Sequence, residues 1–190
     1  MMLAAVVPSA PVAAQDASHG ALTTLDLKAC RMIVRGGVNG KTWRCPGLSG
    51  YPVTVSEVDD RMFLSVGPAA EKQRAAQQTL RAPNTLFPAG STRATIEWRV
   101  PLAAAGLAAP KRVQPYATIV RYTTARDAAR GQVIVVSKVT PTENCHVALI
   151  DAAANADALA LARSIADTIA RAFDCAKPPT VQGATGKSPM

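Results

Sequence analysis

The sequence has few of the residues that enzymes use most often for chemistry. Its 190 residues include 2 histidines and 13 aspartates and glutamates, and aromatic residues make up 4% of the chain. Histidine and carboxylate side chains supply most general acids, general bases and many metal ligands, so candidates for a catalytic or metal centre are few. The shortage of aromatic residues indicates a core built mainly from Val, Ile, Leu and Ala.

Recognisable catalytic and cofactor motifs are also missing. The chain contains no Walker loop, no G-x-G-x-x-G and no G-x-S-x-G, and its cysteines lack the short C-x₂₋₄-C spacing of a zinc site. His146 follows Cys145, but neighbouring residues on a strand point to opposite faces, which argues against a nucleophile and base pair. We expect no cofactor and no metal, and a binding protein rather than an enzyme.

Long hydrophobic runs are absent as well. The apolar run Met1 to Val7 is far shorter than the roughly 20 residues of a membrane helix, so we expect no transmembrane segment. Small residues follow and end in Val12-Ala13-Ala14, which is typical of a signal-peptide cleavage site. We interpret residues 1–14 as a signal peptide remnant and residues 15–24 as a flexible leader. No Lys or Arg precedes the apolar run, so an apolar N-terminal tail is the alternative. Export would place the protein in the periplasm or outside the cell, where disulfides persist.

Four cysteines are present, and they fall into two local pairs. Cys30 and Cys45 flank two strand-like segments and a glycine-rich turn. A loop over residues 36–39 would put the two cysteines opposite each other, at a distance that a disulfide can bridge. A turn centred on Asn39-Gly40 would instead move them out of register. We predict this first disulfide together with the loop that it requires.

The second pair, Cys145 and Cys175, flanks an apolar strand and a predicted helix. That helix begins near Asp151 or Asn155 and ends before Pro178. A strand followed by a returning helix brings its two ends to the same side of a domain, so we predict a second disulfide between Cys145 and Cys175. Four cysteines allow three pairings, and four free thiols in a cytosolic protein are the remaining alternative.

Apolar and polar residues alternate through much of the chain between the cysteine pairs, as in half-buried antiparallel strands. The alternation predicts a strand over 94–100 and hairpins over 53–66 and 116–139. The first hairpin is expected to turn at Asp59-Asp60. Residues 69–80, which follow a Gly-Pro pair, predict a short helix.

These elements define a single predicted domain, residues 25–176. We expect an α+β fold in which an antiparallel sheet of about five to seven strands carries the long C-terminal helix across one face. Residues 177–190 are rich in Pro, Gly, Ser and Thr and predict a disordered tail.

Charge gives the strongest indication of a partner. Lys and Arg number 21 and the net charge is +8, which favours anionic partners. Five basic residues and no acid lie between Leu27 and Ser56, and an aromatic residue is interleaved with them. An ordinary solvated surface is the alternative to a specific site. The candidate binding residues are Arg31, Arg35, Lys41, Trp43 and Arg44.

The sequence therefore predicts an exported, disulfide-stapled, basic protein of a bacterial-type cell envelope that binds an anionic envelope polymer or an acidic protein. It has no helix-turn-helix, zinc-ligand spacing or dense Lys and Arg tail, so we expect no nucleic acid partner.

Two alternatives remain open. A hydrolase or transferase with a dispersed active site would need Glu57, Glu97 or His146 to converge in a deep pocket. Glu97 has a simpler expected role, which is to pair with a cross-strand arginine such as Arg121. A structural subunit of an envelope assembly would instead present a large apolar contact to a second copy.

Overall fold

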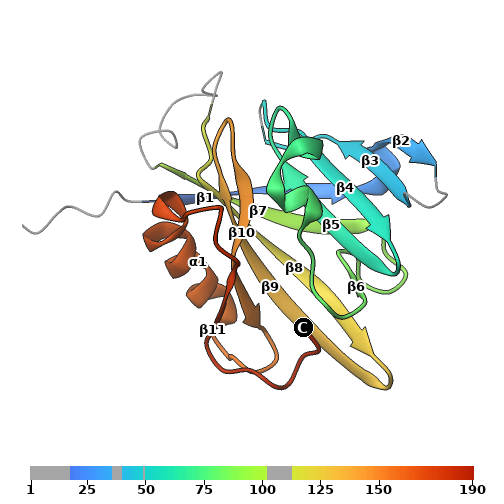
Figure 1. The fold of residues 1–190 in the computed structure, drawn as a ribbon, viewed down its shortest axis with the longest axis vertical. Helices are drawn as coiled ribbons and strands as arrows, with labels where there is room; N and C mark the ends of the chain where they lie inside the picture. The colour runs from blue at the N-terminus through green and yellow to red at the C-terminus, as the bar shows by residue number, and fades with distance from the viewer. Residues whose placement is uncertain (1–17, 36–39, 49, 102–112) are drawn as a thin grey trace, which may run out of the picture.

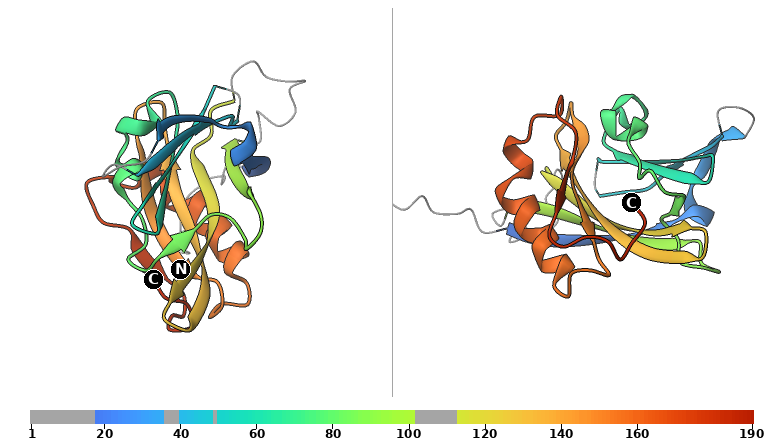
Figure 2. Two further views of the ribbon diagram at one scale, coloured as in Figure 1. Left: turned by 90° about the vertical axis from the view of Figure 1, so that its right-hand side faces the viewer. Right: turned by 60° about the horizontal axis from the view of Figure 1, so that its bottom comes forward.

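The computed structural model describes residues 18–35, 40–48, 50–101 and 113–190. In these ranges the chain forms a seven-stranded sheet, a four-stranded sheet and one α-helix. The seven-stranded sheet lies between the other two layers (Figure 1 and Figure 2). The predicted α+β fold, with one antiparallel sheet and a long helix across it, is therefore wrong, because the protein is mostly β.

Residues from both ends of the chain build the seven-stranded sheet. Its strands follow the order β1, β7, β8, β9, β10 and β11, and β6 pairs with the end of β8 that β7 leaves free. All pairings are antiparallel except that of β10 with β11, which are connected through the helix. The bounds are β1 Ser18–Asp26, β6 Asn84–Thr85, β7 Arg93–Pro101, β8 Ala117–Arg126, β9 Ala129–Val139, β10 Asn144–Asp151 and β11 Thr180–Gln182.

Consecutive strands build the four-stranded sheet, in the order β2, β3, β4 and β5. The predicted hairpin over 53–66 is confirmed, and Asp59 and Asp60 form its turn with φ angles of 48° and 56°. Asp tolerates this left-handed conformation better than most residues. The bounds are β2 Arg31–Arg35, β3 Lys41–Cys45, β4 Val53–Val58 and β5 Arg61–Val66.

The main core lies between the two sheets. Ile96, Trp98 and Val100 point inward from β7, as their predicted alternation requires, and are at most 3% exposed. The Trp98 indole donates to the Thr23 hydroxyl at 2.9 Å, which satisfies its buried N–H. The other face of the same sheet carries Ile119, Ile134 and neighbours that pack against the helix.

The regular strand β1 covers residues 18–24 of the segment 15–24, where a flexible leader was expected. It pairs with β7 along its whole length, from Ser18 opposite Pro101 to Asp26 opposite Arg93. Its inward residues include Ala21 and Thr23, which are too small or too polar to give a strong apolar alternation in the sequence. Residues 1–17, which include the expected signal peptide over 1–14, lie outside the described residues.

The helices are shorter than expected. α1 spans Ala158–Thr168, and a 3₁₀ turn at Ala170–Ala172 follows it. The helix expected over 69–80 is instead two 3₁₀ turns, η2 at Ala70–Lys72 and η3 at Arg74–Gln77. Its buried residues are Ala70, Ala75 and Leu80, and this spacing of five does not fit one face of an α-helix. None of the helices in the described ranges has the length and apolar character of a membrane span.

Both predicted disulfides are confirmed. Cys30 joins Cys45 beside the β2–β3 hairpin, with 4.3 Å between Cα atoms, and Cys145 on β10 joins Cys175 beyond α1, with 5.7 Å between Cα atoms. Next to the first disulfide, β2 and β3 pair in the predicted register. A bulge between Met32 and Val34 then shifts the pairing by one residue, so that Arg35 faces Lys41. The loop over 36–39 lies outside the described residues.

The C-terminal tail, expected to be disordered, instead makes regular contacts. β11 pairs with β10, and the last residues run beside β9. Asp151 at the end of β10 accepts hydrogen bonds from the backbone N–H groups of Lys187 and Ser188, at 2.8 and 2.9 Å. Gly131 leaves room for Ser188, since a Cβ at this position would collide with that residue.

Candidate functional site

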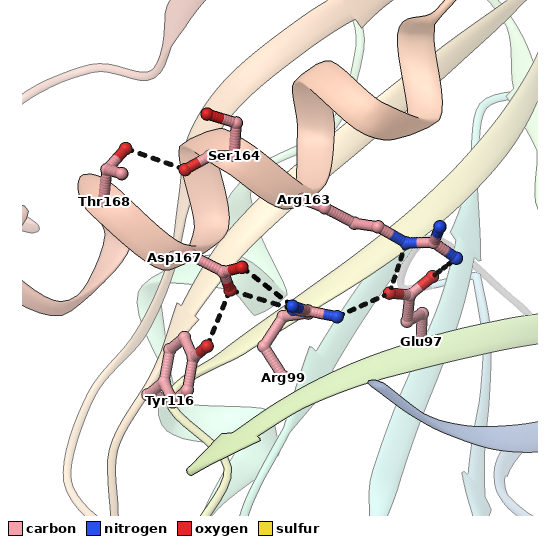
Figure 3. Close-up of polar contacts among 7 residues, drawn as sticks. All are labelled: Glu97, Arg99, Tyr116, Arg163, Ser164, Asp167 and Thr168. Carbon is pink, nitrogen blue, oxygen red and sulfur yellow. Dashed lines mark hydrogen bonds and ion pairs between the residues drawn. The ribbon is translucent and has the colours of Figure 1, made fainter. Parts of the chain in front are cut away.

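A polar cluster joins β7 to α1 (Figure 3). Glu97 and Arg99 lie two residues apart on β7, while Arg163 and Asp167 lie four residues apart on α1. These spacings match the periods of a strand and a helix, so each pair projects from one face. Arg163 donates to both carboxylate oxygens of Glu97, at 2.8 and 2.9 Å. Arg99 donates to both oxygens of Asp167, at 2.9 and 2.7 Å.

Further hydrogen bonds link these two pairs into one network. Arg99 also donates to Glu97 at 3.1 Å, and the Tyr116 hydroxyl donates to Asp167 at 2.6 Å. Hydrogen bonding to Asp167 raises the pKa of Arg99, and hydrogen bonding to Glu97 raises the pKa of Arg163. Both guanidinium groups are therefore held even more firmly in their charged form.

The network is suited to holding α1 against the sheet. Each carboxylate is paired with a guanidinium group, and Glu97 and Arg99 are only 6% and 7% exposed. The Arg171 guanidinium also lies 3.9 Å from the centre of the Tyr116 ring. Arginine does not release its proton in proteins, and both carboxylates already accept hydrogen bonds from arginine through both oxygens. A general acid or base must be able to exchange a proton with a substrate, so this arrangement favours a structural role.

The expected pairing of Glu97 with Arg121 is wrong. Glu97 faces Ile119 in the register of β7 and β8, and Arg121 lies two residues further along. The Arg121 guanidinium donates to Gln132 at 2.7 Å instead. Arg163 pairs with Glu97 in place of Arg121. A helix residue above the sheet can approach the carboxylate with two guanidinium nitrogens, and this bidentate geometry is the stronger one.

The five candidate binding residues of the β2–β3 hairpin do not form a single surface. Trp43 is 8% exposed and belongs to the core between the sheets. Arg44 lies opposite Arg31 and forms an ion pair with Glu71 at 3.4 Å.

Lys41 shares the inward side of β3 with Trp43 but lies at its exposed end. It forms an ion pair with Glu57 at 3.7 Å, and Arg35 is its partner in register. One feature of the sequence could have indicated that Trp43 is buried. Trp43 and Cys45 lie two residues apart on a strand, so their side chains point to the same face, and a buried cysteine implies a buried tryptophan.

An open depression of about 580 Å³ lies between β5, η3 and β10, and we name it the His146 cavity. Its basic residues are Arg61 and Arg81, and Phe63 provides an aromatic wall. None of the described residues that line it is acidic. Its remaining lining residues are Gln77, Gln78, Thr79, Leu80 and Pro179.

His146 is 2% exposed, and burial lowers its pKa to about 4. The imidazole is therefore neutral at neutral pH. The backbone N–H of His146 donates to the side-chain oxygen of Gln78 at 2.8 Å, which ties β10 to the end of η3. Its neighbour Cys145 is in a disulfide, so no thiolate nucleophile is available beside it.

The groups that a dispersed active site would need do not converge. His146 lines the His146 cavity, Glu97 is held in the network on the other side of the sheet, and Glu57 pairs with Lys41. The described ranges also contain no group of three or more His, Cys, Asp or Glu residues that could hold a metal ion. No local pattern in the sequence points to Arg61 and Arg81, because only the folded chain places them beside His146.

Comparison of the chain with family models, curated proteins and solved structures finds no match.

Proposed function

We propose that this protein is an exported binding protein, without catalytic activity, that recognises an anionic envelope polymer through the His146 cavity. The observation that supports it is the composition of the cavity wall: Arg61 and Arg81 face a space of about 580 Å³ whose described lining contains no carboxylate. A cavity of this size is within the range of ligand sites, and its uncompensated positive charge favours carboxylate or phosphate groups.

The rest of the cavity suits a polymer whose units carry hydroxyl groups. Gln77 is exposed and Gln78 half-buried, so their amides supply donors and acceptors, and the half-buried ring of Phe63 offers an apolar face. His146 remains neutral and can accept as well as donate. The cavity therefore combines charge recognition with neutral hydrogen bonding.

The basic β2–β3 hairpin provides a second, weaker contact in this proposal. Arg31 and Arg44 are exposed and lie directly opposite each other, an arrangement of like charges that an anion would relieve. Glu71 already neutralises part of this charge, so we expect the hairpin to contribute mainly to long-range attraction.

Export is supported by the two disulfides, because they persist in oxidising compartments, and by the apolar residues at the start of the chain. Periplasmic or secreted location is part of the proposal. Recovery of the protein from its native compartment with four free thiols would contradict it.

The test compares polygalacturonate, polyglutamate and neutral dextran as ligands in calorimetry. We expect polygalacturonate to bind more tightly than polyglutamate, dextran not to bind, and affinity to fall with salt. Tighter binding of polyglutamate would indicate an acidic protein as the partner instead.

Two charge-reversed variants locate the binding surface with the same change in net charge. Arg61→Glu with Arg81→Glu should reduce affinity by at least about tenfold, while Arg31→Glu with Arg44→Glu should have a smaller effect. An equal loss of affinity in the two variants would mean that only net charge matters. It would rule out the His146 cavity as the recognition site.

A further inference from the structure

α1 covers only part of its face of the seven-stranded sheet. Beside it, a hollow of about 260 Å³ lies over β1, β7, β8 and β9, and a second hollow of about 350 Å³ lies next to it. Thr95 and Arg121 line both hollows, so the two are direct neighbours on this face of the sheet, and we treat them as one region. We name it the α1 groove.

We propose that the α1 groove binds a single-chain anionic amphiphile of the fatty acid type, with its acid group on Arg121 and its acyl chain against Leu22 and Leu159. This ligand differs from the anionic polymer proposed for the His146 cavity, and the groove lies on the opposite face of the sheet.

The groove has apolar walls that no described residue covers. Leu22 on β1 is 69% exposed and Leu159 on α1 is 37% exposed, and both line the same hollow, whose floor includes Ile119 and Ile134. Isolated exposed leucines are common on protein surfaces, but apolar residues that share a concave site are typical of ligand binding.

The charge of the groove selects the head group. The Arg121 guanidinium donates to the neutral Gln132 amide at 2.7 Å, and no described carboxylate lies within ion-pair distance of it. Glu97 also lines the groove, but Arg99 and Arg163 already bind its oxygens. The Arg121 guanidinium is therefore one positive charge that has no described carboxylate partner, and it lies beside the apolar walls of the α1 groove.

This combination favours an anionic amphiphile over other ligand classes. A cationic amphiphile would meet Arg121 and Arg163 at the same wall, and a neutral one would leave the Arg121 charge without a partner. A carboxylate can accept two parallel hydrogen bonds from a guanidinium group, while its acyl chain removes the surfaces of Leu22 and Leu159 from water.

Calorimetry on the full chain with its disulfides intact tests the proposal, with decanoate, decanol and butyrate as probes. We expect decanoate to bind with one molecule per chain, and decanol, which lacks the charge, and butyrate, which lacks the chain length, to bind at least about tenfold more weakly. Equal affinity for decanol and decanoate would overturn the assignment of the head group to Arg121.

Variants locate the site. Arg121→Gln should weaken decanoate by about tenfold and leave decanol unchanged, whereas the matched control Arg130→Gln, at the turn of the same hairpin, should bind decanoate normally. Leu22→Ser with Leu159→Ser should weaken both ligands. If Arg121→Gln and Arg130→Gln behave alike, the proposal is wrong.

Two further measurements separate this proposal from the alternatives. Reversal of Arg61 and Arg81 in the His146 cavity should leave decanoate binding intact, so that failure of either proposal can be recognised independently. A stable dimer in light scattering together with no decanoate binding would show that a second copy covers the groove and would overturn the proposal.

Discussion

Ser188 donates its hydroxyl to the carboxylate of Asp151 at 2.6 Å, and this contact fixes the end of the chain beside β10. The same carboxylate accepts backbone N–H groups from Lys187, Ser188, Ala153 and Ala154. One side chain therefore organises both the turn after β10 and the C-terminal tail.

Asp151→Asn should release the tail. It replaces one acceptor oxygen with an NH₂ group that faces the N–H donors of the partners, and we expect the free energy of unfolding to fall by about 2 kcal/mol. Hydrogen exchange of residues 180–190 should accelerate. Ser188→Ala, which removes only the hydroxyl contacts, should have a smaller effect, and an equal effect would show that the hydroxyl alone holds the tail.

Acid should release the tail in the same way. Burial tends to raise the pKa of Asp151, but the hydrogen bonds from Ser188, Lys187 and Ala154 outweigh it and leave the pKa below its ordinary value of 3.8. The stabilisation is thus present above pH 3.8 and is lost as the pH falls through the lower folded value. An equal response of the tail's hydrogen exchange to acid in wild type and in Asp151→Asn would contradict this.

Gly131→Ala should displace the tail without altering any carboxylate. The added methyl group would collide with Ser188, and backbone strain is not involved because Gly131 has an ordinary φ. We expect faster hydrogen exchange over residues 180–190 and a destabilisation of about 1–3 kcal/mol. Unchanged exchange would mean that the tail is not seated beside β9 in solution.

His146 should make stability depend on pH near neutrality. Its folded pKa of about 4 lies below the ordinary 6.5, so between these values the unfolded chain binds a proton that the folded protein does not. The free energy of unfolding should fall by on the order of 3 kcal/mol as the pH is lowered from 6.5 to 4. His146→Leu should flatten this part of the denaturation profile, and an unchanged slope would show that the imidazole is not desolvated.

The network under α1 should be far more sensitive to mutation than an exposed ion pair. Asp167→Ala removes the bidentate partner of the buried Arg99, and we expect a loss of about 3 kcal/mol in urea denaturation. The matched control Glu57→Ala breaks the exposed pair with Lys41 and should cost less than about 1 kcal/mol. Similar losses in both variants would contradict the assigned role of the network.

The strands with strong alternation could be predicted from sequence. β7 was predicted because Ile96, Trp98 and Val100 alternate with polar residues, and the turn at Asp59-Asp60 was predicted from its turn residues. The disulfides were predicted because each pair of cysteines flanks elements that return the chain to its starting side. Such signals are local and need no knowledge of the rest of the fold.

The division into two sheets could not be predicted in this way. β2 to β5 pair with one another, but nothing local to them shows that β6 joins β8 rather than β5. The small inward residues of β1 hide its pairing with β7, and the segment after the parallel strand β11 is held by Asp151 and Asn155, which bind Lys187 and Ala184. These are long-range relationships, and they also determine which arginines gather around His146.

The Cys145–Cys175 disulfide closes a ring that contains most of β10 and all of α1. A pulling force on the C-terminus would therefore pass from one cysteine to the other through the sulfur atoms and bypass the helix. Only residues 176–190, which include the short strand β11, could be drawn out before the load reached β10. Mechanical tension or a protease that grips this end would thus leave α1, and the groove beside it, in place.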